Sequence, residues 1–174
     1  MMDCQVAIME NAFMRYHVMG EIPKRLGTRH PSSTPFQAFQ TSNGHVVVAI
    51  MGGSTDQWPL FCAAIDHPEL IDDERYSSGW LRTQHYEELE PIFNHAFLQR
   101  STDDWVSELS GMGIPCGPVQ DLAQVSSDPQ VAEREMFIDL DHPKLGKWKS
   151  TGNPIKLSRT PGRPKQTAPA LGEH

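Results

Sequence analysis

The stretch Ile114-Pro115-Cys116-Gly117-Pro118-Val119 decides how the middle of this chain folds, because it is dense in residues that fix backbone shape. Pro115 and Pro118 restrict φ and lack an amide donor. Gly117 can take a positive φ or allow another backbone to come close. We therefore expect a buried crossover with special geometry here, rather than an active site.

Helix signals lead up to this stretch. Ser101 and Thr102 begin a capped helix with acidic residues in its first turn, where the helix dipole favours them. Another helix is expected over residues 82–100, with Pro91 as a kink or break. A third helix over residues 56–65 has Ser54 or Thr55 as its cap. The Gly52-Gly53 pair before it resembles a phosphate cradle only superficially, since no Gly-Lys-Ser/Thr ending follows.

Strand signals lie on both sides of these helices. Phe36–Gln40 alternates apolar and polar residues, His45–Ile50 is rich in β-branched residues, and Asn43-Gly44 lies between them. This pattern predicts a β-hairpin. After the central stretch, residues 121–135 predict short helices with Asp128 as a cap, and residues 136–140 and 148 onward predict strands.

The two ends of the chain differ in composition and in the structure that they predict. Apolar residues at spacings of four and three predict one amphipathic helix that Gly20 ends, and they are Met2, Val6, Met9, Phe13 and Tyr16. Left exposed, this stripe favours self-association, so we expect a dimer. The tail beyond residue 155 is rich in proline and basic residues and has little core of its own.

Composition narrows the class of protein. The 174 residues carry a formal charge of −7, with scattered Lys and Arg, so we expect no nucleic-acid partner. Cys4, Cys62 and Cys116 are an odd number of cysteines at wide spacings, which favours reduced thiols and a cytoplasmic location. The sequence shows neither a signal peptide nor an apolar run of membrane-spanning length, so no membrane association is expected.

No metal site and no self-sufficient catalytic group is predicted. Asp72-Asp73-Glu74 is interpreted as a solvated face, because adjacent acids without a further ligand rarely bind a cation. His85 and His95 lack the i,i+4 partners of a helical metal site. Cys116 as a nucleophile would need a base, and no Cys–His pairing can be read from the sequence. We therefore favour a small buried thiol.

An ordered set of motifs gives the chain a family resemblance. It includes Gly27-Thr28-Arg29-His30-Pro31, Trp58, His67-Pro68-Glu69-Leu70, Arg82, Gly113 to Val119, Asp128-Pro129-Gln130, Gly152-Asn153-Pro154 and Leu171-Gly172-Glu173-His174. In this combination the sequence resembles the C-terminal part of family III CoA-transferases, the group of formyl-CoA and carnitine CoA-transferases and acyl-CoA racemase relatives. The resemblance covers essentially the whole chain.

The resemblance implies an α+β fold: a small domain with an antiparallel sheet and flanking helices, an N-terminal linker helix and an extended C-terminal tail. It places a linker helix and loop at residues 1–35, the small domain at 36–155 and the C-terminal linker at 156–174. In this family a large CoA-binding domain carries the nucleophilic Asp, and two chains interlock as a dimer. No catalytic residue carries over onto this chain, and its CoA-binding residues are unknown. CoA and acyl-CoA would be substrates of the full-length protein, and no tightly bound cofactor is expected.

The resemblance also suggests one candidate site. In some family members a glycine-rich loop of the small domain closes over the reaction intermediate and excludes water. The matching positions are Gly27, Thr28, Arg29 and His30, with only one glycine among them. These residues are candidates for a substrate lid, and a purely structural loop is the alternative.

Three functions compete at this point. The first is the C-terminal portion of a family III CoA-transferase, which moves CoA between an acyl-CoA and a carboxylic acid and is inactive without the large domain. The second is a non-catalytic dimerisation module with the same fold. The third, ranked last, is a small enzyme that uses Cys116 with a histidine.

Overall fold

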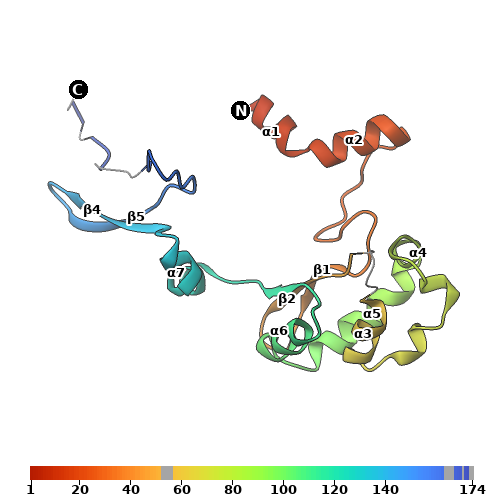
Figure 1. Ribbon diagram of the computed structural model, residues 1–174. Coiled ribbons are helices and arrows are strands. Elements are labelled where there is room, and N and C mark those ends of the chain that lie inside the picture. The colour runs from red at the N-terminus through yellow and green to blue at the C-terminus, as the bar shows by residue number, and fades with distance from the viewer. Residues whose placement is uncertain (52–56, 163–166, 170, 173–174) are drawn as a thin grey trace. The chain divides into compact units, whose positions relative to one another are not determined.

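The computed structural model describes residues 1–51, 57–162, 167–169 and 171–172. Its contacts divide the chain into two compact units, Met1–Val119 and Gln120–His174. The division falls inside the small domain predicted at 36–155, whose boundaries stay a prediction. Two small antiparallel sheets and flanking helices confirm the α+β class (Figure 1).

The first unit holds one three-stranded sheet and most of the helices. Its helices and strands are α1 (Met2–Ile8), α2 (Glu10–Met19), β1 (Phe36–Gln40), β2 (His45–Ala49), α3 (Trp58–Ala64), η1 (Pro68–Leu70), η2 (Glu74–Tyr76), α4 (Gly79–Gln84), α5 (Tyr86–Leu98), α6 (Thr102–Gly111) and β3 (Cys116–Pro118). The second unit consists of α7 (Leu122–Ser127), α8 (Pro129–Glu133), β4 (Phe137–His142) and β5 (Gly146–Thr151). In the second unit, β4 and β5 pair antiparallel.

The predicted hairpin is confirmed, and its second strand, β2, is the central strand of the first sheet. Phe39 pairs with Val46 and Ala38 with Val47, and β2 also pairs antiparallel with β3. Burial alternates along β2 as strand geometry requires: Val46 and Val48 are fully buried, whereas Val47 is exposed. The sheet thus has one face in the core and one face in solvent.

Helices cover the buried face of this sheet (Figure 1). The core consists mainly of aromatic side chains from α3, α5 and α6, among them Trp58, Phe61, Phe93, Phe97 and Trp105. The rings of Phe39 and Phe97 stack with centroids 4.4 Å apart. Both buried indole N–H groups have partners: Trp58 donates to the carbonyl of Leu70 and Trp105 to that of Phe97. Such pairing is what burial of an indole requires.

The proline- and glycine-rich stretch at 114–119 folds differently from the prediction. Cys116–Pro118 is an edge strand on β2, and its residues are half-buried or exposed. Gly117 has no positive φ, and a Cβ there would meet no atom within 4 Å. The prediction of a buried crossover was therefore wrong. The left-handed turn belongs to Gly113, with φ of 73°, which ends α6.

Two predicted helices are each divided in two. The N-terminal helix breaks at Met9, whose N–H bonds to the carbonyl of Val6 in a tightened turn. Gly20 ends α2 in the left-handed conformation, as expected. The helix predicted at 82–100 is interrupted at His85, whereas α5 continues through Pro91. Of the two outcomes predicted for Pro91, a break is wrong, and a kink stays a prediction.

The predicted caps are confirmed where the structure describes them. The Ser101 hydroxyl accepts from the amide of Asp104, and the Asp128 carboxylate accepts from the amides of Gln130 and Val131. The expected cap at Ser54 or Thr55 and the Gly52-Gly53 turn lie outside the described residues, as does the end of the C-terminal motif at Glu173-His174.

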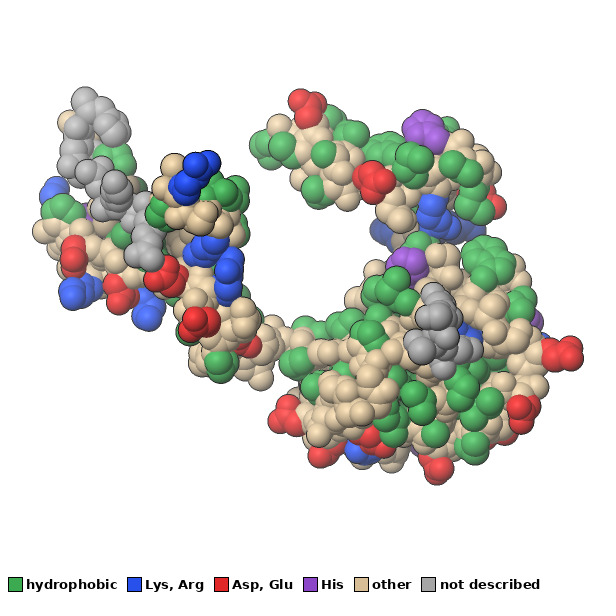
Figure 2. Space-filling view, in the orientation of Figure 1, with side chains coloured by type: hydrophobic (Ala, Val, Ile, Leu, Met, Phe, Trp, Pro, Cys, Tyr) green, Lys and Arg blue, Asp and Glu red, His purple; other side chains and the backbone are tan. Residues whose placement is uncertain are grey.

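The apolar stripe of α1 and α2 is exposed. None of the residues of these two helices is buried, and hydrophobic side chains spread over both (Figure 2). Phe13 is 38% exposed and Met2 is 74% exposed. Together with Ile22 and Pro23, side chains of α2 line an apolar hollow of about 330 Å³.

Candidate functional site

The lid candidates form a turn that is fixed against the free edge of β1. Gly27 has φ of 65°, which glycine tolerates best. The Thr28 hydroxyl accepts a hydrogen bond from the amide of Ala38 at 3.2 Å. The amide of His30 donates to the carbonyl of Phe36 at 2.9 Å. The two rings of His30 and Phe36 stack, with centroids 4.8 Å apart and an interplanar angle of 8°. The turn thus covers an edge strand that would otherwise offer unpaired backbone groups.

Arg29 is held separately, on an aromatic ring of α5. Its guanidinium carbon lies 4.0 Å from the centroid of the Tyr86 ring, and its Nε donates to the carbonyl of Leu26 at 3.3 Å. A guanidinium over an aromatic face gains cation–π attraction. The structure therefore brings Arg29 together with a residue distant in sequence that no motif singled out.

A buried chain of hydrogen bonds fixes Tyr86 in turn. Its hydroxyl accepts from Nε2 of Gln37 at 2.8 Å and donates to a carboxylate oxygen of Glu90 at 2.9 Å. Burial is the main cause that raises the pKa of Tyr86, and the Glu90 carboxylate adds to it. The phenol is therefore neutral at physiological pH and can donate to Glu90.

Sequence reasoning missed this network for an identifiable reason. Gln37 looked like the polar, solvent-facing residue of an alternating strand, yet it is only 7% exposed. Tyr86 precedes Leu89 and Phe93 at helical spacing, on the buried face of α5. That spacing was a usable signal for Tyr86. For Gln37 the signal was its position two residues before Phe39, because residues i and i+2 of a strand share one face of the sheet.

Arg82 is a second residue whose position was not foreseen. Its side chain is 1% exposed, although it was quoted only as part of the family motif. Its Nε donates to the carbonyl of Thr34 at 2.6 Å, and a terminal nitrogen donates to that of Tyr76 at 2.8 Å. Its guanidinium carbon lies 4.4 Å from the Trp58 ring centroid. Arg82 therefore ties α4 to the segment that leads from the lid candidates into β1.

One residue of the acidic cluster, Asp73, and one of the two histidines, His85, take part in surface ion pairs. Asp73 accepts from Arg75, which also pairs with Glu88, and His85 contacts Glu88 at 2.9 Å. Hydrogen bonding to Arg75 lowers the pKa of Asp73, and hydrogen bonding to His85 lowers that of Glu88. Within the part of the chain that the structure describes, no group of three or more His, Cys, Asp or Glu could hold a metal ion.

Cys116 is half-buried and has no base beside it among the contacts of the described residues. Its sulfur lies 3.4 Å from the hydroxyl of Ser110 and donates to the carbonyl of Val106 at 3.7 Å. Neither group can accept a proton to generate a thiolate. The contacts give no support to an enzyme based on Cys116.

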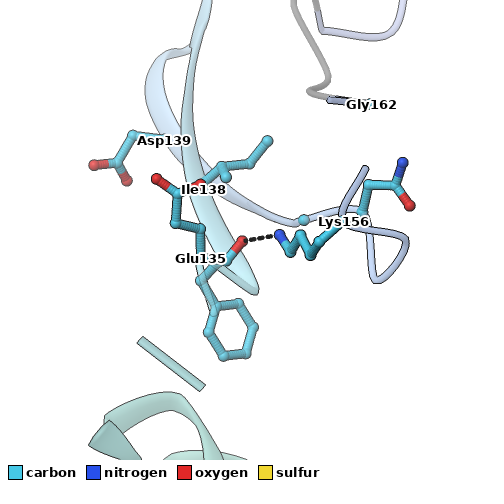
Figure 3. A pocket seen from close by; sticks show the side chains of 8 residues that line it. Glu135, Ile138, Asp139, Lys156 and Gly162 are labelled. Atoms are coloured by element: carbon cyan, nitrogen blue, oxygen red, sulfur yellow. Dashed lines mark hydrogen bonds between the residues drawn. The ribbon is translucent and has the colours of Figure 1, made fainter. Parts of the chain in front are cut away.

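The second unit has a cavity of its own, of about 290 Å³ (Figure 3). Lys156 reaches across it and donates to the carbonyl of Glu135 at 3.5 Å. Asp139 and Glu135 also line it, so the lining holds one cationic and two acidic side chains. Gly152 is required here, because a Cβ at that position would overlap the carbonyl oxygen of Glu135. This mixed lining does not select an anionic ligand.

Comparison with known proteins places the whole chain in one group. The sequence model of CoA-transferase family III matches residues 1–174. The chain belongs to CoA-transferase family III. This confirms the resemblance drawn from the motifs, and the match extends over all 174 residues.

Relatives in this family include enzymes named for dicarboxylic acids. The human succinyl-CoA:glutarate CoA-transferase is 32% identical over 174 residues, which is all of this chain and 39% of the relative. The succinate–glutarate CoA-transferase of Agrobacterium fabrum is 30% identical over 174 residues, or 43% of its length. The chain thus spans less than half the length of these relatives.

Solved structures agree on the fold. A CAIB/BAIF family protein from Brucella suis superposes with a TM-score of 0.79 at 30% identity, covering 99% of this chain and 44% of that one.

Among the described residues, every helix is too short or too polar to pass through a lipid bilayer.

Proposed function

We propose that this chain is the C-terminal portion of a family III CoA-transferase, which moves CoA between an acyl-CoA and a carboxylic acid. The match of the family to the whole chain carries the proposal. On this proposal, the large domain that carries the nucleophilic Asp and most CoA contacts in the family is not part of these 174 residues, which span 39% of the human relative. The chain then contributes substrate-enclosing residues and half of an interlocked homodimer in the cytoplasm.

The family chemistry proceeds by covalent catalysis in balanced steps. The Asp carboxylate attacks the acyl-CoA carbonyl, which gives a mixed anhydride and releases CoA thiolate. The thiolate then attacks the Asp carbonyl, which frees the first acid and leaves an enzyme–CoA thioester. The acceptor carboxylate then attacks this thioester, which gives a second mixed anhydride and releases CoA thiolate. The thiolate attacks the acyl carbonyl of the acceptor, which forms the new acyl-CoA and frees the Asp carboxylate.

The small domain's task in this chemistry is to keep water from the anhydride. The turn at Gly27–His30 fits that task because it is short, anchored and not buried. Thr28 and His30 fix it to β1, and Arg29 rests on Tyr86. A preorganised turn can enclose an intermediate without a further cost of ordering a flexible loop.

The test is CoA transfer with and without the missing part. The chain is expressed alone, and also together with the part of the Agrobacterium fabrum relative that it does not cover. Glutaryl-CoA formed from succinyl-CoA and glutarate is measured by chromatography. We expect no product from the chain alone and product from the co-expressed sample. Robust turnover by the chain alone, or none by a folded co-purified assembly, would refute the proposal.

A dimerisation module without catalysis is the second candidate, and the exposed stripe of α1 and α2 favours it. An exposed apolar side chain forgoes about 1.5–3 kcal/mol of burial, so pairing of two such stripes is a favourable outcome. The two candidates separate in the same co-expression experiment: a module of this kind would dimerise alone and leave CoA transfer by the assembly absent.

A further inference from the structure

Arg29 is held in place, yet its terminal nitrogens have no partner among the described residues. The Nε bond to Leu26 and the contact with Tyr86 are the interactions that hold it. Within the part of the chain that the structure describes, neither terminal nitrogen donates a hydrogen bond, and the guanidinium forms no ion pair. A fixed guanidinium therefore presents two NH₂ groups that no group of the described chain uses.

Two other arginines of the first unit form ion pairs. Arg75 pairs with Asp73 and Glu88, and Arg100 pairs with Glu108. Glu90 lies on the same helix face as Tyr86, but it accepts from the Tyr86 hydroxyl rather than from Arg29. Arg29 thus combines the fixed position of a structural arginine with the free donors of a binding one.

The free donors suit a carboxylate. The planar guanidinium fork matches the two oxygens of a carboxylate, and such charge-assisted pairs are stronger than neutral hydrogen bonds. The stacking on Tyr86 and the bond from Nε restrict the side chain in advance. Little rotamer entropy is then lost when an anion binds.

We propose that Arg29 binds the free carboxylate of a dicarboxylic acid, as a substrate-binding residue of the CoA transfer proposed above, on which this role rests. When CoA passes between two dicarboxylic acids, both the acyl-CoA and the acceptor acid keep one carboxylate that takes no part in the exchange. One arginine can therefore serve both halves of the reaction. A monocarboxylic acid would leave the two NH₂ groups unpaired in the enclosed site.

The first test measures binding without catalysis. In the folded chain, the Nε–H resonance of Arg29, assigned by comparison with Arg29→Gln, is followed by NMR during titration with glutarate, acetate or CoA. We expect a saturable shift with glutarate, a much smaller one with acetate, and no comparable shift at Arg25, an exposed arginine of the same connection. Equal shifts at Arg25 and Arg29 would show general ion binding and overturn the proposal.

The second test measures transfer by the co-expressed assembly. Arg29→Gln is expected to raise KM for glutarate about 10- to 100-fold, as the loss of a charge-assisted hydrogen-bonded pair implies. Arg29→Lys should lie between it and the wild type, and Arg25→Gln should match the wild type. KM for acetyl-CoA, which has no free carboxylate, should not change. A rise for acetyl-CoA equal to that for glutarate would assign Arg29 to the CoA phosphates and overturn the carboxylate role.

The two proposals fail in different ways. If the wild-type assembly transfers CoA and Arg29→Gln has an unchanged KM for glutarate, the role of Arg29 is wrong and the transfer function stands. If the wild-type assembly transfers no CoA while glutarate still shifts the Arg29 resonance, the transfer function is wrong and the carboxylate site remains.

Discussion

Removal of the Tyr86 hydroxyl tests whether the network beneath the lid candidates stabilises the fold. The hydroxyl accepts from Gln37 and donates to Glu90, and the side chains of Tyr86 and Gln37 are only 5% and 7% exposed. Tyr86→Phe keeps the ring on which Arg29 rests. It leaves the buried amide donor of Gln37 without its acceptor, which is the costly outcome when one partner of a buried hydrogen bond is lost.

The expected magnitude follows from that orphaned amide. A buried donor left unpaired costs about 1–3 kcal/mol of unfolding free energy. The first unit lies between the two size classes in which each kcal/mol lowers the melting temperature by about 4–8 °C and about 2–4 °C, so the fall should lie between about 2 and 24 °C. The assay is urea denaturation followed by fluorescence, with thermal melting on the same samples. Tyr16→Phe is the matched control, because that hydroxyl has no hydrogen bond among the described residues and its side chain is 44% exposed.

A double variant separates the hydrogen bond from other effects. Gln37→Met replaces the amide by an apolar side chain of similar shape, so Tyr86→Phe should cost less in its presence. The coupling energy between the two sites is expected to be about 0.5–3 kcal/mol. Additive effects, or a Tyr86→Phe variant as stable as Tyr16→Phe, would refute the reasoning.

The same hydroxyl predicts a dependence on alkaline pH. Burial raises the pKa of Tyr86 above its ordinary value of 10.0, so the unfolded chain loses this proton at a lower pH than the folded chain. Stability is therefore full below pH 10 and falls as the pH rises through the folded-state pKa. Tyr86→Phe should lack this contribution to the alkaline loss.

Three further predictions concern other parts of the chain. Gly152→Ala should destabilise the Gln120–His174 unit by about 1–3 kcal/mol in urea denaturation, since its Cβ overlaps the Glu135 carbonyl, whereas Gly117→Ala has open space and should be neutral. Asp128→Ala should reduce helicity by circular dichroism. Backbone hydrogen bonds lower the pKa of Asp128 below 3.8, so the difference in helicity between the wild type and Asp128→Ala should vanish as the pH falls through the folded-state pKa. The helicity of Asp128→Asn should not depend on pH in this range. Phe13→Glu should shift the oligomer towards monomer in sedimentation velocity if the exposed stripe pairs two chains.

Local signals predicted the elements that depend on neighbouring residues. The hairpin follows from alternation and from Asn43-Gly44, and the caps at Ser101 and Asp128 follow from side chains that reach amides a few residues away. Gly20 ends α2 for a similarly local reason, since glycine adopts the left-handed conformation at little cost. In each case the contact spans only a few positions of the sequence.

Predictions failed where distant contacts decide the conformation. Pro115 and Gly117 looked like special backbone, but β2 offered a free edge, and the carbonyl of Pro115 accepts from the amide of Ala49. Asn43 looked like a turn residue alone, yet its side chain also accepts from the amide of Thr102 at the start of α6. Neither pairing can be read from the residues nearby.

The sequence by itself determined the family, the α+β class, the hairpin and the apolar stripe of the N-terminal segment, because motifs, periodicity and caps depend on residues close together in the chain. That this stripe is exposed was decided by the structure. Only the tertiary structure decided that Gln37 is buried, that Tyr86 supports Arg29, and that Cys116 is an edge-strand thiol with no base beside it in the described contacts. These facts depend on side chains that meet across tens of residues, where packing and hydrogen bonding in the folded core outweigh local preference.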